Sequence, residues 1–326
     1  MIGLAEGAFR WSAPAASSLA GEYDLLLYSL LGLCALVGGA VGLLIAAFGL
    51  RYRRGSPAPR LPRIGRRTGH LLEIGWMLVP LALFLVLFAW GGSLYLRMHS
   101  PPADALVIQG VAKQWMWKFQ HPGGQREINR LHVPAGRPVR LRLASQDVIH
   151  SFYVPAFRVK RDVLPWHYSE LWFEAEQPGR YHLLCAEYCG TEHSAMRGRV
   201  VVLTPQDYAR WLERQGVEDS PAQRGEALYR AHGCSGCHGA QAQVRAPDLA
   251  GLYGRPVPLE GGGTVRADET YLRDAILHPQ RQVVAGYAPL MPAYAGQIDE
   301  AEIFDLIAYL RSLQASGDMP RGEVSR

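Results

Sequence analysis

Two thiols, an imidazole and a thioether lie within the twelve residues from Cys185 to Met196, which read Cys185-Ala-Glu-Tyr-Cys189-Gly-Thr-Glu-His193-Ser-Ala-Met196. Soft sulfur together with imidazole is a donor set that favours copper. Two thiolates four residues apart, with more donors close behind, could bridge two metal ions. This loop is therefore the first candidate for a chemical site.

A second cluster of sulfur and imidazole lies nearer the C-terminus, where Cys234-Ser-Gly-Cys237-His238 follows an amphipathic segment. Cys-x-x-Cys-His is the attachment signature of c-type haem, in which the two thiols bond the vinyl groups and the histidine ligates the iron. Met291, in Pro289-Leu290-Met291-Pro292, is the expected second axial ligand, because a methionine flanked by proline suits that role. Such Met/His ligation raises the haem potential. A redox-active dithiol is the alternative here, and a disulfide in an exported protein is the alternative for both cysteine pairs.

Two uncharged stretches precede these sites, at about 25–50 and 74–96. A membrane span needs ~20 apolar residues, so both stretches predict transmembrane helices. Seven arginines lie in the segment 51–67 between them, and the positive-inside rule places this loop in the cytoplasm. Both termini and the rest of the chain are then expected on the outer side. A cleaved signal peptide is the alternative for the first stretch, but the apolar core is too long for one.

The segment 99–215 is expected to form a β domain. Turn signals rich in proline and glycine separate its short runs of β-branched and aromatic residues. Such spacing favours a sandwich or a small barrel. The loop from Cys185 to Met196 would join the last two strands, and His150 would end an earlier strand, from which it could complete a metal site. The strands are predicted at 105–112, 139–143, 169–175, 180–185 and 199–203.

The remaining segment, 221–326, is expected to form an all-α domain. A helix at 205–215 closes the β domain, and 216–220 reads as a polar linker. Further helices are predicted at 222–233, 268–277 and 299–313. The last of these has apolar residues at helical spacing and acidic residues in its first turn, as the helix dipole favours.

The basic charge of the chain, formally +5, comes mainly from arginine. Because the segment 51–67 holds a run of these arginines, the charge says more about a membrane-flanking loop than about nucleic acid. No nucleic-acid reading motif is present, and no nucleic-acid partner is expected. Cys34 lies inside the first apolar stretch and is expected to pack as a small hydrophobic residue.

Together, these features resemble subunit II of the haem–copper cytochrome c oxidases over about residues 23 to 215. The resemblance implies a multidomain chain, in which a two-helix transmembrane hairpin precedes a cupredoxin-like β-barrel or sandwich. The segment from about 221 to 314 resembles a class I cytochrome c and implies an all-α cytochrome c domain with covalent haem c. The residues that carry the first resemblance are the hairpin with Glu73 and Trp76, the run Gln114-Trp-Met-Trp-Lys-Phe119, the segment His150-Ser-Phe152 and the loop Cys185–Met196.

The resemblance also implies a dinuclear copper centre, CuA. The ligands carried over by position are Cys185 and Cys189 as bridges, His150 and His193 as caps of one copper each, and Met196 and the backbone carbonyl of Glu187 as weaker ligands.

Three further roles are carried over in the same way. Trp115 would be the residue through which electrons reach CuA, and Glu73 would lie on a proton-uptake path. The side chain of Glu187 would help to hold a Mg²⁺ ion shared with subunit I, since carboxylate oxygen suits that ion. The alternatives are that Trp115 merely alternates with Trp117 on a strand and that Glu73 is solvated at the membrane boundary.

One departure from the family pattern is visible after Leu164. The family usually has Pro-Gly-Arg there, whereas this chain has Pro165-Trp166-His167. The turn, and any contact made by the family's arginine, are therefore in doubt.

The resemblance predicts an enzyme subunit: subunit II of a caa-type cytochrome c oxidase in the bacterial inner (cytoplasmic) membrane. It would accept electrons at haem c, from an external cytochrome c or a membrane-bound donor, and pass them through CuA to the haem–copper subunit I. That subunit would reduce oxygen to water, coupled to proton translocation, and subunit III is a further expected partner. The alternatives are the CuA-bearing subunit of a nitric oxide reductase and a stand-alone membrane-anchored electron-transfer or copper protein. A quinol-oxidising relative would lack the copper ligands.

Overall fold

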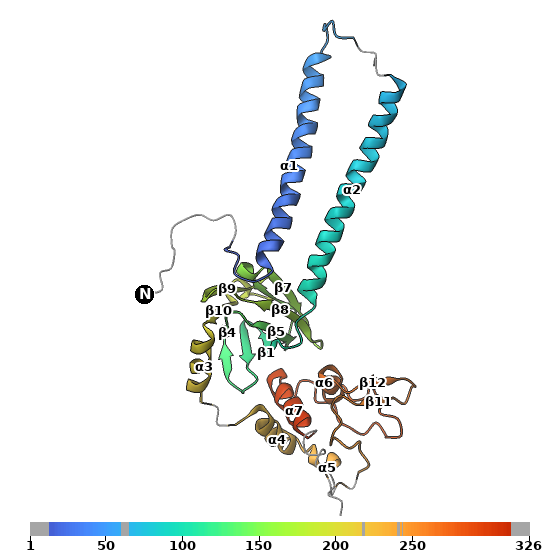
Figure 1. Cartoon of the computed structure of the whole chain (residues 1–326). Helices are drawn as coiled ribbons and strands as arrows, with labels where there is room; N and C mark the ends of the chain where they lie inside the picture. Colours follow the sequence, from blue (N-terminus) through green and yellow to red (C-terminus); the bar gives the residue numbers. More distant parts are fainter. Residues whose placement is uncertain (1–12, 60–64, 217–218, 240–241, 243, 314–326) are drawn as a thin grey trace, which may run out of the picture.

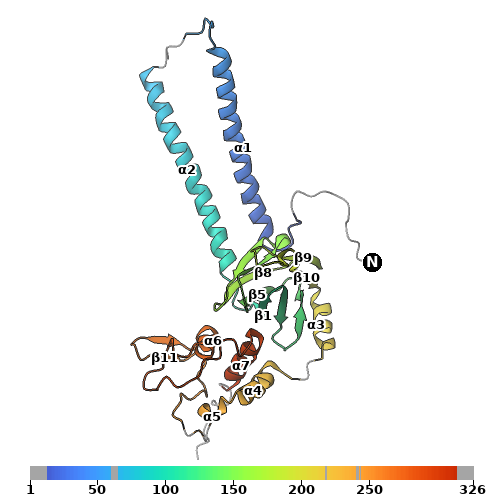
Figure 2. The ribbon, with the colours of Figure 1, turned by 180° about the vertical axis from the view of Figure 1, so that it is seen from behind.

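The computed structural model describes residues 13–59, 65–216, 219–239, 242 and 244–313. Two long helices project from a β domain, and a smaller helical domain lies against the β domain on the side away from these helices (Figure 1, Figure 2). The chain thus contains a helical hairpin, a β domain and a helical domain in that order. This arrangement confirms the multidomain fold expected from the sequence.

The two long helices are α1, which spans Ala20–Arg51, and α2, which spans Arg66–His99. Each contains an 18-residue window of mean hydropathy 2.4, and no part of either window is buried. Apolar helices that expose their side chains all round suit lipid, and a helix satisfies its own backbone hydrogen bonds there. The two predicted membrane helices are therefore confirmed, and both extend beyond the uncharged stretches of the sequence.

Polar contacts fasten the base of this hairpin to the β domain. The guanidinium of Arg158 donates to the carboxylate of Asp24 on α1 at 2.7 and 2.8 Å. The indole of Trp172 donates to the backbone carbonyl of Arg97 on α2 at 3.0 Å. Both helices are therefore held at the same end of the β domain.

The β domain is a sandwich of two five-stranded sheets, with the orders β3-β2-β1-β5-β8 and β4-β10-β9-β6-β7. Most neighbours are antiparallel, but β1 pairs with β5 and β10 pairs with β4 in parallel. One buried cluster, which includes Ile108, Leu141, Phe152 and Leu183, fills the space between the sheets. The sandwich confirms the cupredoxin-like fold. Its strands are β1 (Leu106–Lys113), β2 (Met116–Gln120), β3 (Arg126–Ile128), β4 (Arg130–Pro134), β5 (Pro138–Ser145), β6 (His150–Val154), β7 (Val159–Val163), β8 (Ser169–Glu174), β9 (Gly179–Cys185) and β10 (Arg197–Leu203).

The strands at β1, β5, β8, β9 and β10 match the five predicted from the sequence. One local prediction was wrong, because His150 begins β6 and does not end a strand. The reason is a turn just before it. The Asp147 carboxylate accepts from the amide of Val148 at 2.7 Å, and the Ser145 hydroxyl bonds back to the Val148 carbonyl. This turn directs the chain into β6 with the imidazole at the strand's first position.

A buried carboxylate ties helix α3 (Pro205–Arg214) to the sandwich. Glu127 on β3 pairs with His121 at 2.9 Å and with His132, and His121 also bonds the Tyr208 hydroxyl of α3 at 3.0 Å. The indole of Trp211 on α3 stacks on His132, with ring centroids 4.6 Å apart. The helix predicted to close the β domain is thus anchored by hydrogen bonds and ring stacking.

The C-terminal domain contains the helices α4 (Pro221–Ala231), α5 (Ser235–His238), α6 (Glu269–Leu277) and α7 (Glu300–Ser312). It also contains a small two-stranded sheet, β11 (Pro256–Pro258) with β12 (Thr264–Arg266), which the sequence did not predict. Helices α4 and α7 cross so closely that a Cβ at Gly225 would lie 2.0 Å from the carbonyl oxygen of Asp305. Only glycine allows this approach, so Gly225 fixes how the two helices pack.

Candidate metal centre and haem site

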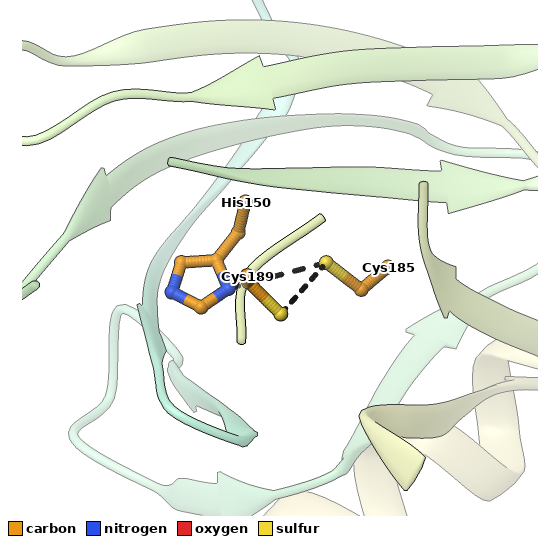
Figure 3. A group of neighbouring side chains, drawn as sticks. All are labelled: His150, Cys185 and Cys189. Atoms are coloured by element: carbon orange, nitrogen blue, oxygen red, sulfur yellow. Dashed lines mark hydrogen bonds between the residues drawn. The ribbon is translucent and has the colours of Figure 1, made fainter. Parts of the chain in front are cut away.

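The two cysteines of the candidate metal loop lie side by side. Cys185 ends β9 and Cys189 lies in the loop that follows, and their sulfur atoms are 3.8 Å apart. Figure 3 shows the two thiols and His150 pointing toward one another. All five cysteines of the chain are free thiols in the structure, which contradicts the disulfide alternative for both pairs.

Each thiol has one imidazole as a neighbour. The Nδ1 atom of His150 lies 3.9 Å from the Cys185 sulfur, and Nδ1 of His193 lies 3.3 Å from the Cys189 sulfur. His150 comes from the start of β6, whereas His193 begins a short 3-10 helix, His193–Ala195, within the loop. The fold therefore brings a remote histidine to a locally encoded group of donors.

Two weaker donors complete the group. The thioether sulfur of Met196 lies 3.8 Å from the Cys189 sulfur, and the carbonyl oxygen of Glu187 lies 3.3 Å from the Cys185 sulfur. Met196 and Cys189 are buried, whereas the Glu187 side chain is exposed. The four other donor atoms that the resemblance implied as copper ligands thus lie around the two thiols.

The two thiols ionise very differently. Burial opposes ionisation of Cys185, but its hydrogen bonds with His150 and with backbone groups outweigh burial and lower the pKa of this thiol to about 6. Burial and the negative charge of Cys185 raise the pKa of the Cys189 thiol to about 12. The two thiols cannot both be ionised near neutral pH unless a cation replaces the second proton. Soft cations bind such thiolate and imidazole donors, so these residues fit copper.

Two residues support this group in ways that sequence reasoning missed. Asp147 accepts from Nε2 of His150 at 2.8 Å, which leaves Nδ1 facing the thiols. The backbone amide of Gln114 donates to the Asp147 carboxylate at 2.7 Å, and the side-chain amide of Gln114 donates to the carbonyl of Cys189 at 2.8 Å. The only sequence signal for Asp147 was its position three residues before the candidate ligand His150.

Trp115 lies directly against the metal loop. Its indole nitrogen donates to the carbonyl of Cys189 at 3.2 Å, and its ring is half-buried. A Cβ at Gly190, where φ is +116°, would lie 2.9 Å from the side chain of Gln114 and 3.3 Å from the Trp115 ring. Trp117, by contrast, is fully buried and packs edge-on against His150. Trp115 is thus the tryptophan of this run that contacts the loop itself.

The departure at Pro165-Trp166-His167 keeps a turn without the family's glycine. Trp166 adopts a left-handed backbone with φ of +59° and exposes 64% of its surface. A bulky aromatic residue is strained in that conformation. The turn is therefore kept at the cost of backbone strain at Trp166.

The c-type haem signature lies on α5 and the residue before it. Nδ1 of His238 bonds the carbonyl of Pro247 at 2.9 Å, so Nε2 remains for an iron ligand. Cys234 is half-buried and Cys237 is exposed. Two thiols followed by an imidazole that a backbone carbonyl orients fit covalent haem. Met291 lies half-buried on the loop between α6 and α7, and its ligation stays a prediction.

Glu73 lies near the start of α2 and is exposed, with its carboxylate 3.5 Å from His70. Its role stays a prediction, as does the role of the Glu187 side chain toward Mg²⁺.

Two family models match the chain. The model described as "Cytochrome C oxidase subunit II, periplasmic domain" matches residues 124–203, and "Cytochrome c" matches residues 222–314. Cytochrome c oxidase subunit 2 of Alkalihalophilus pseudofirmus is 28% identical over 309 residues, which cover 90% of this chain and 87% of that protein. Cytochrome c oxidase subunit 2 of Metridium senile is 31% identical over 169 residues, which cover 44% of this chain and 68% of that protein. The periplasmic domain of subunit II of cytochrome oxidase of Bradyrhizobium japonicum is 30% identical, covers 36% of this chain and 96% of its own, and has a TM-score of 0.35.

The fold and the two sites define a membrane-anchored redox protein with a cupredoxin-like domain and a cytochrome c domain. Within that class, the chain belongs to the cytochrome c oxidase subunit II family, with a cytochrome c domain added at its C-terminus. The subunit II domain implies copper, and the cytochrome c domain implies haem c. Membership of this family implies association with other subunits of a haem–copper oxidase.

Proposed function

We propose that this chain is the subunit through which electrons reach a caa-type cytochrome c oxidase. The observation that supports this most directly is the ring of imidazole, thioether and carbonyl donors around two thiols 3.8 Å apart. Copper held there, and haem c held by the second domain, would each supply one-electron redox chemistry.

The arrangement of the thiols favours two coppers over one. Cys185 and Cys189 would bridge them, and His150 and His193 would each bind one, since each imidazole faces a different sulfur. Met196 and the Glu187 carbonyl would be the weaker ligands. The Glu187 side chain is exposed, so it is available to a Mg²⁺ ion shared with a neighbouring subunit.

The residues around these ligands would keep the centre rigid. The ligands come from β6, β9 and the loop after β9, which are anchored in one sheet of the sandwich. Asp147 fixes the tautomer and the orientation of His150. A site supported in this way changes little when its charge changes, which suits an electron carrier.

The proposal also assigns a direction to electron flow. The cytochrome c domain would accept electrons from an external cytochrome c or a membrane-bound donor, and the copper domain would deliver them to the haem–copper subunit I. Trp115, bonded to the Cys189 carbonyl, would carry electrons toward the copper centre. Subunit I would reduce oxygen to water and translocate protons, with Glu73 on its proton-uptake path, and subunit III would complete the complex.

The division of the chain and its location follow from the same proposal. The hairpin and N-terminal segment would be residues 1–98, the copper domain 99–215, the linker 216–220 and the cytochrome c domain 221–326. The arginine-rich loop would face the cytoplasm of a bacterium, with both termini and both redox domains outside the inner membrane.

Purification of the intact membrane complex through this chain tests the proposal. We expect the haem–copper subunit to co-purify and the complex to consume oxygen with reduced cytochrome c as donor. The variant Cys189→Ser should abolish this activity, whereas the matched variant Cys34→Ser, on an exposed face of α1, should keep it. A complex that consumes nitric oxide but not oxygen would contradict the proposal and favour a nitric oxide reductase.

A further inference from the structure

The cytochrome c domain shares a small apolar core with the copper domain. Phe304 of α7 stacks on Tyr168, which lies just before β8, with ring centroids 5.6 Å apart and planes at 23°. The two rings are buried together with Val111 of β1 and Ala144 of β5. Both ribbon views show α7 next to the β domain (Figure 1, Figure 2).

A buried carboxylate beside this core has partners in both domains. We call Asp305, Gln120, Arg126 and Arg224 the interdomain clasp. Asp305 of α7 is 1% exposed and accepts from Gln120 of β2 at 2.9 Å and from Arg126 of β3. Arg224, within the cytochrome c domain, donates to both carboxylate oxygens at 2.9 and 3.0 Å. A buried carboxylate depends on its partners. Separation of the domains would remove Gln120 and Arg126 from Asp305 and leave it with Arg224.

The other ion pairs across the contact have the same polarity. Arg142 of β5 pairs with Glu269 of α6 at 2.9 Å, and both side chains are largely buried. Lys118 of β2 lies 3.9 Å from Asp299, the N-cap of α7. In these two pairs and in the pair of Arg126 with Asp305, each of which crosses the contact, the copper domain supplies the cation and the cytochrome c domain supplies the carboxylate. Such complementarity is what fixes the register of a specific interface.

The clasp is connected directly to the haem-attachment segment. The Asp305 backbone packs on Gly225 of α4 so closely that no Cβ fits between them. The chain leaves α4 at Ala231 and reaches Cys234 three residues later. The helix that docks on the copper domain therefore also fixes the helix that leads into the haem site.

We propose that the interdomain clasp keeps the cytochrome c domain docked on the β3-β2-β1-β5-β8 sheet. This contact, and not the linker, sets the position of haem c relative to the copper centre. The consequence for electron transfer rests on the proposed function, but the docking itself does not. A domain that was only tethered would have to find its partner by diffusion at an effective concentration in the ~mM range, whereas a docked domain would not.

Cross-linking of the full-length chain tests the docking. A zero-length carbodiimide should join Lys118 to Asp299, and mass spectrometry should find the linked peptides. The variant Arg126→Glu places a carboxylate opposite Asp305 and should lower the yield of this cross-link about tenfold or more. The matched control is Arg130→Glu on β4, the next strand along the chain and part of the other sheet, because exposed Arg130 has no ion pair within the residues that the structure describes.

Absence of the cross-link from the wild-type chain, or an unchanged yield in Arg126→Glu, would overturn the docking. Asp305→Asn should act like Arg126→Glu. If Asp305→Asn instead fails to incorporate haem, Arg126→Glu decides alone, because Arg126 lies outside the cytochrome c domain. The rate of electron transfer from haem c to copper should fall together with the cross-link, and an unchanged rate would refute the positioning role. A chain that cross-links but binds no copper would contradict the proposed function and leave the docking standing.

Discussion

Asp147 offers a sharp test of how the metal centre is built, because one carboxylate holds three groups around it. Its oxygens accept from Nε2 of His150 at 2.8 Å and from the backbone amides of Gln114 and Val148 at 2.7 Å each. A hydrogen on Nε2 of His150 leaves the lone pair on Nδ1, the atom 3.9 Å from the Cys185 sulfur. Asp147 should therefore set the tautomer in which His150 can bind copper.

The variant Asp147→Asn keeps the shape of the side chain and removes its charge. The single carbonyl oxygen of the asparagine can accept from some of the three donors. Its NH2 group would face at least one N–H, and that hydrogen bond would be lost. Loss of such a partner of a metal-binding histidine typically weakens metal binding by about 10- to 100-fold. Since each factor of ten is about 1.4 kcal/mol, we expect a loss of about 1.4 to 2.8 kcal/mol in copper binding.

Competition titration measures this loss. The full-length wild-type and variant chains would be stripped of copper and reloaded against a chelator of known affinity. Asp162→Asn is the matched control, because Asp162 is exposed and bonds Ser151 and Lys160 but not a candidate ligand. Equal copper affinity of Asp147→Asn and the wild type would show that Asp147 does not orient His150.

Three other substitutions test separate parts of the account. Burial opposes a low pKa for Glu127, but hydrogen bonds from two histidines outweigh it and keep the pKa below the ordinary 4.5. The stabilisation that Glu127 contributes is therefore present above that value and lost as the pH falls through its folded-state pKa. Glu127→Gln should accordingly lower the melting temperature at neutral pH and make the melting temperature fall less steeply in acid. Met291→Leu should lower the haem potential and disturb the low-spin spectrum; unchanged spectra would remove Met291 as a ligand. Glu73→Ala should slow proton uptake by the whole complex without affecting copper reduction, and unaltered turnover would mean that Glu73 is merely solvated at the membrane boundary.

The donors of the metal loop could be predicted because most of them are close in sequence. Cys185, Cys189, His193 and Met196 fall within one loop, so their residue types alone indicate a soft metal. His150 was proposed as the remote histidine that completes the site, and the resemblance to a known family supported it. The supporting role of Asp147 was not predicted. That role depends on which ring nitrogen of His150 the carboxylate faces, and sequence spacing does not reveal this.

The contact between the domains could not be predicted for a related reason. Gln120 and Asp305 are 185 residues apart in sequence, and each on its own looks like an ordinary polar residue. The sequence showed a polar linker, which suggests a tether. The structure shows paired charges and a shared apolar core, which only the folded domains bring together.

The ratio of copper to haem iron in the purified full-length chain tests the central claim most directly. After copper loading, the chain should hold two coppers and one covalent haem, because two thiols with one imidazole each form a site for a pair of ions. A single copper per haem would contradict the dinuclear centre, and with it the proposed route of electrons through this subunit.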